Sequence, residues 1–179
     1  MTKAENNQKY AIRFGLGAIK AVGFNVMEKA TKVREEQGNF KDIYDFAQKL
    51  DAKSINKKSI EALAKSGSFD SIHTNRRQVS ESFEILSAYA SKKEEESNSD
   101  QMSLFGGTKE ADYKPPLKEI SDWQKEERLQ REFEAKSFFL NEHPLDDKIS
   151  ALKKRGAIFS TKIEKDELED NDLIKIAGI

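Results

Sequence analysis

The sequence feature that most constrains the fold is a tight turn at Val22-Gly23 between two short helical patterns. Before the turn, Leu16 and Ile19 are three residues apart, as on one face of a helix. After it, apolar side chains recur on one helical stripe that stops at Gly38: Val26, Ala30 and Val33. Since glycine has no Cβ, Gly23 leaves room for close approach to the backbone. The pattern predicts a helix, a short glycine hairpin and a second helix.

Helix, glycine hairpin and helix, in that order, resemble the helix-hairpin-helix motif, which binds the sugar-phosphate backbone without reading bases. Backbone N–H groups at such a turn and at a helix N-terminus can donate to a phosphate. The candidate DNA contacts here are Lys20, Val22, Gly23 and Lys29. The motif usually has glycine at both hairpin positions, whereas this sequence has Ala21 at the first. An ordinary helical hairpin that packs against its neighbours fits the glycine pattern equally well.

A second unit of the same kind is predicted after an intervening amphipathic helix, which is marked by Phe40, Ile43, Phe46 and Leu50. Its two helices cover residues 56–66 and 75–90, with a small-residue turn between them. Asn56 and Asn75 are the expected N-caps, because an asparagine side chain can accept a hydrogen bond from a free N–H group of the first turn. Residues 10–90 are therefore predicted to form a tandem helix-hairpin-helix bundle.

Two arginines stand in the first turn of the helix predicted over 75–90. Arg76 and Arg77 place positive charge where the helix dipole is itself positive. This favours an external anion, and both residues are candidate DNA contacts. A solvated surface arginine is the alternative interpretation for either one.

Residues 91–120 are predicted to form a flexible linker, because they combine a charged run, a glycine pair and Pro115-Pro116 without apolar periodicity. The linker contains an isolated peptide with an apolar end, Gln101-Met102-Ser103-Leu104-Phe105. Leu104 and Phe105 would enter an apolar pocket on a partner, while the Gln101 amide bonds to the pocket rim. Alternatively, the apolar side chains of this peptide fold back onto the nearest helix.

The same five residues resemble the pentapeptide by which bacterial proteins bind the DNA sliding clamp. In that pattern Met102 replaces a leucine, which conserves volume. The resemblance implies a clamp-binding role for Gln101, Met102, Ser103, Leu104 and Phe105.

Residues 121–156 are predicted to be helical. Ser121 and Gln124 have the spacing of a capping box, and the helix that they start carries an apolar stripe of Leu129, Phe133 and Leu140. Pro144 suits the first turn of a further helix that Gly156 closes.

The last part of the chain, residues 157–179, has the character of a β segment. Ile158 and Phe159 are expected to be extended, and residues 173–179 have a strand pattern. We expect no partner for this strand, so the sequence suggests the start of a truncated β domain. The acidic run at 164–172 is interpreted as a solvated loop.

Composition excludes several classes of site. The chain has no cysteine and two histidines, which argues against a zinc centre, and His143 is interpreted as a turn residue. No apolar run approaches a membrane span and no signal-peptide pattern is present, so a cytoplasmic location is expected. Residues 1–80 carry a net charge of +6 and residues 81–179 one of −7. The front half is thus only mildly basic.

Several of these motifs occur in the same order in one family, the alpha subunit of bacterial replicative DNA polymerase III. They include the turn that ends at Gly23, the peptide at 101–105, and Phe138-Phe139-Leu140-Asn141-Glu142-His143-Pro144-Leu145-Asp146, which is similar to a signature of that family. The resemblance covers about residues 10–179, from the end of the fingers region to the first strand of an OB-fold.

This resemblance implies a DNA-directed DNA polymerase as the parent chain, with duplex DNA, the sliding clamp (beta subunit) and other replicase subunits as partners. The catalytic aspartates and Mg²⁺ of the family belong to a palm domain outside this sequence, so we expect no catalytic or metal-binding residue here. Two alternatives are a stand-alone helix-hairpin-helix DNA-binding protein and a helical adaptor.

Overall fold

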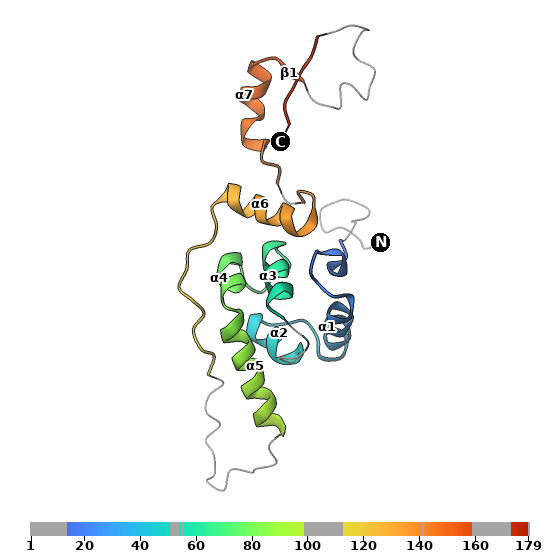
Figure 1. The fold of residues 1–179 in the computed structure, drawn as a ribbon, viewed down its shortest axis with the longest axis vertical. Coiled ribbons are helices and arrows are strands. Elements are labelled where there is room, and N and C mark those ends of the chain that lie inside the picture. Colours follow the sequence, from blue (N-terminus) through green and yellow to red (C-terminus); the bar gives the residue numbers. More distant parts are fainter. Residues whose placement is uncertain are drawn as a thin grey trace. The chain divides into compact units, whose positions relative to one another are not determined.

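The computed structural model describes residues 14–50, 54, 56–98, 113–140, 142–158 and 173–178. The chain divides into two compact units, Met1–Phe138 and Phe139–Ile179. The described residues of the first unit form a 3-10 turn and six helices, which are η1 (Leu16–Ala18), α1 (Phe24–Gln37), α2 (Ile43–Leu50), α3 (Lys57–Lys65), α4 (Arg76–Glu81), α5 (Phe83–Asn98) and α6 (Lys125–Lys136) (Figure 1). The prediction of a mainly α fold with a short C-terminal β segment is confirmed.

The core of the first unit is made by the apolar faces that the sequence predicts. α2 packs against α5, and α3 packs against α4. Completely or almost completely buried side chains include Ile43, Leu50, Ile60, Leu63, Val79 and Leu86. Phe46 joins two neighbouring segments, because its ring meets those of Phe40 and Phe69 edge-on at 5.1 and 4.9 Å. Burial of such side chains contributes about 1.5–3 kcal/mol each.

The first predicted helix is much shorter in the structure. From residue 14, where the described part of the chain begins, to the turn, only η1 forms, and Leu16 is 40% exposed while Ile19 is buried. Gly15 and Gly17 flank Leu16, and glycine disfavours a helix by about 1 kcal/mol relative to alanine. Ile19 therefore joins the core from the turn that follows η1.

The helix predicted over 75–90 is interrupted, and the next helix runs further than predicted. Ser82, which is fully buried, separates α4 from α5 and accepts a hydrogen bond from the Lys118 N–H at 3.2 Å. α5 then continues to Asn98, so the predicted linker boundary at residue 91 is wrong. Ion pairs from Lys92 and Lys93 to Glu96 span one helical turn and stabilise this charged stretch as helix.

Residues 113–120 are extended and bound to the helical bundle, although they belong to the predicted flexible linker. The Tyr44 hydroxyl donates to the Pro115 carbonyl, and the Asn75 side chain donates to the Ile120 carbonyl at 2.7 Å. Leu117 packs against the core. The linker is thus fixed on its C-terminal side.

An ion pair with Lys114 also joins this segment to Asp42, the residue just before α2. Burial pushes the pKa of the Asp42 carboxyl up, but hydrogen bonds from Lys114 and from the N–H groups of Asp45 and Tyr44 outweigh it and hold the pKa below 3.8. Since this pKa is lower in the folded protein than in the unfolded one, the resulting stability is present above about pH 4 and is lost at lower pH.

We expect Lys114→Gln to lower the free energy of unfolding at neutral pH by at most about 1 kcal/mol, because both partners are partly exposed. At acidic pH the difference in stability between the variant and the parent should become smaller, since protonation of Asp42 removes its negative charge in both. Urea denaturation at the two pH values measures this difference. An equal loss at both would contradict the charge argument.

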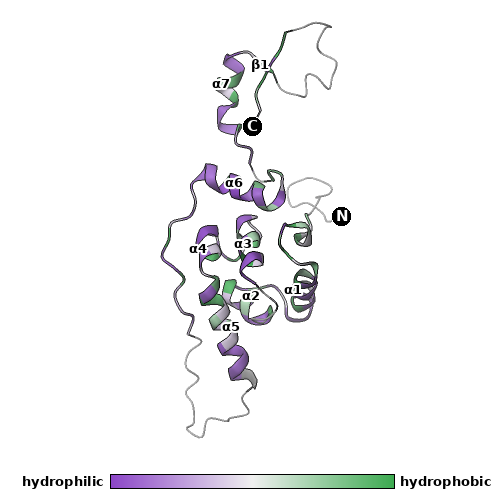
Figure 2. Ribbon diagram, in the orientation of Figure 1, coloured by the Kyte–Doolittle hydropathy of each residue, from purple (hydrophilic) through white to green (hydrophobic). Residues whose placement is uncertain are grey.

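α6 differs from its prediction at both ends. Gln124 is its N-cap but makes no side-chain cap bond, so the predicted capping box with Ser121 is wrong. The helix ends at Lys136, because its C-cap Ser137 takes a positive φ of 68°. Leu129 is buried, whereas Phe133 is 45% exposed. Because α6 is hydrophilic along most of its length (Figure 2), apolar burial alone does not explain its position.

In the second unit the structure describes η2 (Asp146–Lys148), α7 (Ile149–Lys154) and two short strands, β1 (Ala157–Ile158) and β2 (Lys175–Ile176). The strands are parallel, with Ala157 opposite Lys175. The expectation that the last strand has no partner is therefore wrong. Gly156 closes α7 with a φ of 78°, as predicted.

His143 is a turn residue, as predicted. Its Nδ1 accepts from the Leu145 N–H at 3.2 Å, and its own backbone N–H donates to the Asp146 carboxylate at 2.7 Å.

Phe159 and the acidic run at 164–172 lie outside the described residues. No helix in the described parts of the chain is long and apolar enough to cross a membrane.

Candidate nucleic-acid interface

The candidate interface is the first hairpin, residues 19–24, which joins η1 to α1. Its turn is closed by a hydrogen bond of 3.1 Å from the Val22 N–H to the Ile19 carbonyl. Ala21 has a φ of 64°, in the left-handed region that glycine prefers. For a residue with a Cβ, that conformation is less favourable than the right-handed one by about 1–2 kcal/mol. The tight turn therefore forms despite the alanine, with strain at Ala21.

The first turn of α1 is open to an anion. Gly23 is the N-cap, and within the described residues the backbone N–H groups of Gly23, Phe24 and Asn25 have no acceptor. The first turn of α1 has no acidic residue, so its partial positive charge is not compensated there. A Cβ on Gly23 would meet only Val26, at an ordinary 3.7 Å. Packing within the described residues thus does not require glycine at this position.

The predicted contact residues of this hairpin have different surroundings. The Lys20 side chain is exposed, whereas Val22 is a buried core residue that can offer only its backbone. The Lys29 ammonium donates to the Ser54 hydroxyl at 2.9 Å. Phe24 was not predicted as a site residue, yet it is 72% exposed beside the free N–H groups. Lys20 and Gly23 therefore remain the more accessible candidates of the four predicted here.

The second hairpin, residues 66–75, has the predicted caps. The side chains of Asn56 and Asn75 each accept a backbone N–H at 2.9 Å. Gly67 has a φ of 78°, and a Cβ there would lie 2.2 Å from an Arg76 nitrogen. Glycine is required at position 67 because other residues rarely adopt this positive φ. It is also required because a side chain would occupy the space of the Arg76 guanidinium.

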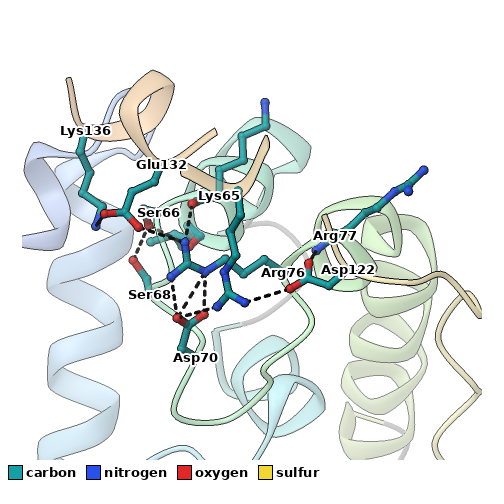
Figure 3. A network of polar contacts seen from close by, with 11 residues as sticks. Lys65, Ser66, Ser68, Asp70, Arg76, Arg77, Asp122, Glu132 and Lys136 are labelled. Atoms are coloured by element: carbon teal, nitrogen blue, oxygen red, sulfur yellow. Dashed lines mark hydrogen bonds and ion pairs between the residues drawn. The ribbon is translucent and has the colours of Figure 1, made fainter. Parts of the chain in front are cut away.

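Arg76 is the centre of a buried ionic network that joins the second hairpin to α6 (Figure 3). The network consists of Asp70, Arg76, Glu132 and Lys136. Arg76 donates to Asp70 at 2.6 and 2.9 Å and to Glu132 at 3.1 Å, and Lys136 contacts Glu132 at 3.2 Å. Arg76 is 4% exposed and Glu132 is 1% exposed.

This burial gives Arg76 a structural role, in contrast to the expectation that it faces a DNA phosphate. Burial lowers the pKa of its guanidinium, but hydrogen bonds and charge from Asp70 and Glu132 raise the pKa more, so Arg76 stays charged. Arg77 is partly exposed and pairs with Glu81 at 2.9 Å. Its backbone N–H donates to Asp122 at 3.0 Å.

Arg76 and Arg77 were predicted to face an external anion, but the anions beside the first turn of α4 are carboxylates of the protein itself. Asp122 accepts from the first turn of α4, and Asp70 and Glu132 surround Arg76. The sequence does contain a signal for this network, because Glu132 and Lys136 are four residues apart on one helix. Their burial is not readable from the sequence, since charged side chains usually face water.

The remaining predicted site, the peptide 101–105, lies outside the described residues. Within the described residues, no cluster of three or more histidine, cysteine or acidic side chains is placed to hold a metal ion.

Comparison with known proteins agrees with this geometry. A family described as helix-hairpin-helix motif matches residues 2–79, which include the first hairpin and most of the region up to the end of α4. The DNA polymerase III subunit alpha of Caulobacter vibrioides is 37% identical over 147 residues, which are 82% of this chain and 13% of that protein.

Two further relatives carry the same name. The protein of Rickettsia conorii is 35% identical over 94% of this chain, and that of Rickettsia prowazekii is 41% identical over 76%. The chain spans only 11–14% of the length of these three relatives. This chain is therefore homologous to the alpha subunit of DNA polymerase III, over a segment that contains a helix-hairpin-helix motif.

Proposed function

We propose that this chain binds duplex DNA through the first hairpin, as part of a replicative DNA polymerase. The observation that carries the proposal is the open N-terminus of α1, where three successive N–H groups lack an acceptor among the described residues. A phosphate oxygen can accept from such groups, and Lys20 adds charge beside them. Contacts of this kind position a protein on DNA without reading its sequence.

The two hairpins contribute differently to this proposal. The first hairpin leaves N–H groups and Lys20 available, whereas the second uses Arg76 and Asp70 within the ionic network. Arg77 stays a secondary DNA contact, because its pairing with Glu81 is partly exposed and can exchange for a phosphate. Lys29 is likewise secondary, since binding DNA would require it to leave Ser54.

Clamp tethering is the second part of the proposed function. Gln101, Met102, Ser103, Leu104 and Phe105 form the proposed docking peptide for a bacterial sliding clamp. The helix before the peptide ends at Asn98, and the chain is bound again to the bundle from Tyr113 onward, through Lys114 and Pro115. The peptide would thus be presented between two fixed ends, which keeps the clamp close to DNA held by the hairpin.

The larger protein is proposed to be a DNA-directed DNA polymerase that works with other replicase subunits in the cytoplasm. We assign no catalytic residue or Mg²⁺ ligand to this chain. A helical adaptor without DNA binding is disfavoured by the homology to polymerase subunits along most of the chain.

The DNA proposal predicts that Lys20→Glu weakens duplex binding by roughly 10-fold, because one phosphate contact is lost and repulsion replaces it. The slope of log affinity against log salt concentration should become shallower by about 1. Fluorescence anisotropy with a labelled duplex at several salt concentrations measures both values.

Lys92→Glu is the matched control, since it makes the same charge change on α5, which extends away from α6 in Figure 1. This control should change affinity by less than about 3-fold through net charge alone. Equal losses for both variants would mean that only net charge matters, and would remove the first hairpin as the site.

A further inference from the structure

The first hairpin is held from two sides by groups that lie far away in the sequence. The Ser59 hydroxyl on α3 donates to the Ala21 carbonyl at 3.1 Å. The Lys20 N–H donates to the Ala135 carbonyl at 3.0 Å. The first bond fixes the peptide group between Ala21 and Val22, and the second fixes the peptide group between Ile19 and Lys20, one residue before the strained Ala21.

Ser59 is itself held in place. It is 1% exposed, and its backbone N–H is bound by the Asn56 cap at 2.9 Å. The hydroxyl therefore has little freedom to choose another acceptor. At the other bond, Ala135 lies in the last turn of α6, where helix carbonyls have no partner within the helix. The Lys20 N–H satisfies one of them.

α6 packs against α3, and the ionic network joins it to α4. Glu132, on the same helix as Ala135, bonds to Arg76 of α4. Contacts thus run from the second hairpin through α6 to the Lys20 peptide group. The first hairpin is braced by α3 directly and by the second hairpin indirectly.

We infer that Ser59 is a positioning residue for phosphate binding, which holds the first hairpin in its binding shape by fixing Ala21 in the left-handed conformation. The reason lies in the departure from the motif. A glycine at this position would adopt a positive φ without strain, whereas alanine disfavours it. With glycine at position 21 no restraint would be needed. With alanine there, the Ser59 hydrogen bond supplies the restraint that holds the positive φ. This inference rests on the proposed DNA-binding function of the hairpin.

Ser59→Ala tests the inference, with Ser66→Ala as the matched control. Ser66 is also buried, and its hydroxyl donates to the Leu63 carbonyl at 2.8 Å, within α3 and its C-cap. Both variants thus lose a buried hydroxyl bond to a carbonyl, and Ser66→Ala also loses the hydrogen bond between the Ser66 and Ser68 hydroxyls at 2.7 Å. We expect Ser59→Ala to weaken duplex binding by about 5- to 10-fold and Ser66→Ala to weaken it by less than about 2-fold.

A rescue experiment separates positioning from general damage. Adding Ala21→Gly to the Ser59→Ala variant should restore affinity to within about 2-fold of the parent, because glycine takes the positive φ unaided. The same glycine in the Ser66→Ala variant should change affinity little. Equal affinities of the two serine variants, or no rescue by glycine, would overturn the inference.

Hydrogen exchange tests the brace without DNA. In the Ser59→Ala variant the Val22 amide, which bonds to Ile19, should exchange about 10-fold faster than in the Ser66→Ala variant. If the parent chain does not bind DNA, the proposed function fails, while this exchange difference still decides whether Ser59 holds the turn. Unchanged exchange at Val22 would overturn the brace itself.

Discussion

Replacing Arg76 with alanine is expected to lower the free energy of unfolding by about 3–5 kcal/mol, because the change leaves buried charge without its partner. Glu132 is 1% exposed and would lose its ion pair with Arg76, and Asp70 would lose the same partner while it keeps Arg128 at 3.3 Å. The space that the guanidinium occupies beside Gly67 would also be left empty. Urea denaturation followed by circular dichroism measures the loss.

The neighbouring residue provides the control. Arg77→Ala removes an arginine from the same helical turn, but its ion pair with Glu81 is 41% exposed on both sides. Such pairs contribute at most about 1 kcal/mol. Both arginines lie in the first turn of the same helix, so a large difference between the two losses of unfolding free energy would reflect the burial of Arg76. A loss below about 1 kcal/mol for Arg76→Ala would contradict the buried network.

Changing Gln101, Leu104 and Phe105 together to alanine is expected to weaken binding to a bacterial sliding clamp by more than about 100-fold. Two apolar side chains in a pocket and one amide at its rim would carry most of the energy of so short a peptide, and each such contact is worth about 2 kcal/mol or more. Surface plasmon resonance with immobilised clamp measures the affinity of both proteins.

Thr108→Ala is the control for this peptide, because Thr108 follows the five residues in the sequence and is not one of the proposed clamp contacts. It should change clamp affinity by less than about 3-fold. DNA binding should be unaffected in both variants, since the first hairpin is unchanged. Clamp binding that survives the triple change would place the contact outside 101–105, and no binding by the parent to any matched clamp would remove tethering from the proposed function.

The sequence predicts the helical core well because apolar periodicity and capping are local signals. Asn56 and Asn75 cap the helices that were expected, and Ile60, Leu63 and Leu86 are buried as their spacing indicates. A cap requires only a side-chain oxygen at the right position before a helix. Such features need no knowledge of which helices meet.

Features that depend on tertiary contacts were not predictable in this way. Nothing local indicates that Glu132 reaches Arg76, which is 56 positions away in the sequence. The extended segment at 113–120 was expected to be flexible, since its bonds to Tyr44 and Asn75 come from distant helices. Likewise, the predicted capping box at Ser121 does not form, and the neighbouring Asp122 accepts hydrogen bonds from the Arg77 N–H and the Arg128 guanidinium.

The first hairpin depends both on local sequence signals and on tertiary contacts. The turn was predicted from Gly23, and its resemblance to a DNA-binding motif agrees with the family match over residues 2–79. Its conformation at Ala21 could not be predicted, because the bonds from Ser59 and to Ala135 that accompany it come from α3 and α6.

The most direct test of the central proposal is an NMR titration of the ¹⁵N-labelled chain with a short DNA duplex at low salt. The proposal predicts that the amide signals of Gly23, Phe24 and Asn25 shift most, and that added salt reverses the shifts. Shifts confined to α5 or to residues 139–179, or no shift at all at a large excess of duplex, would contradict DNA binding by the first hairpin.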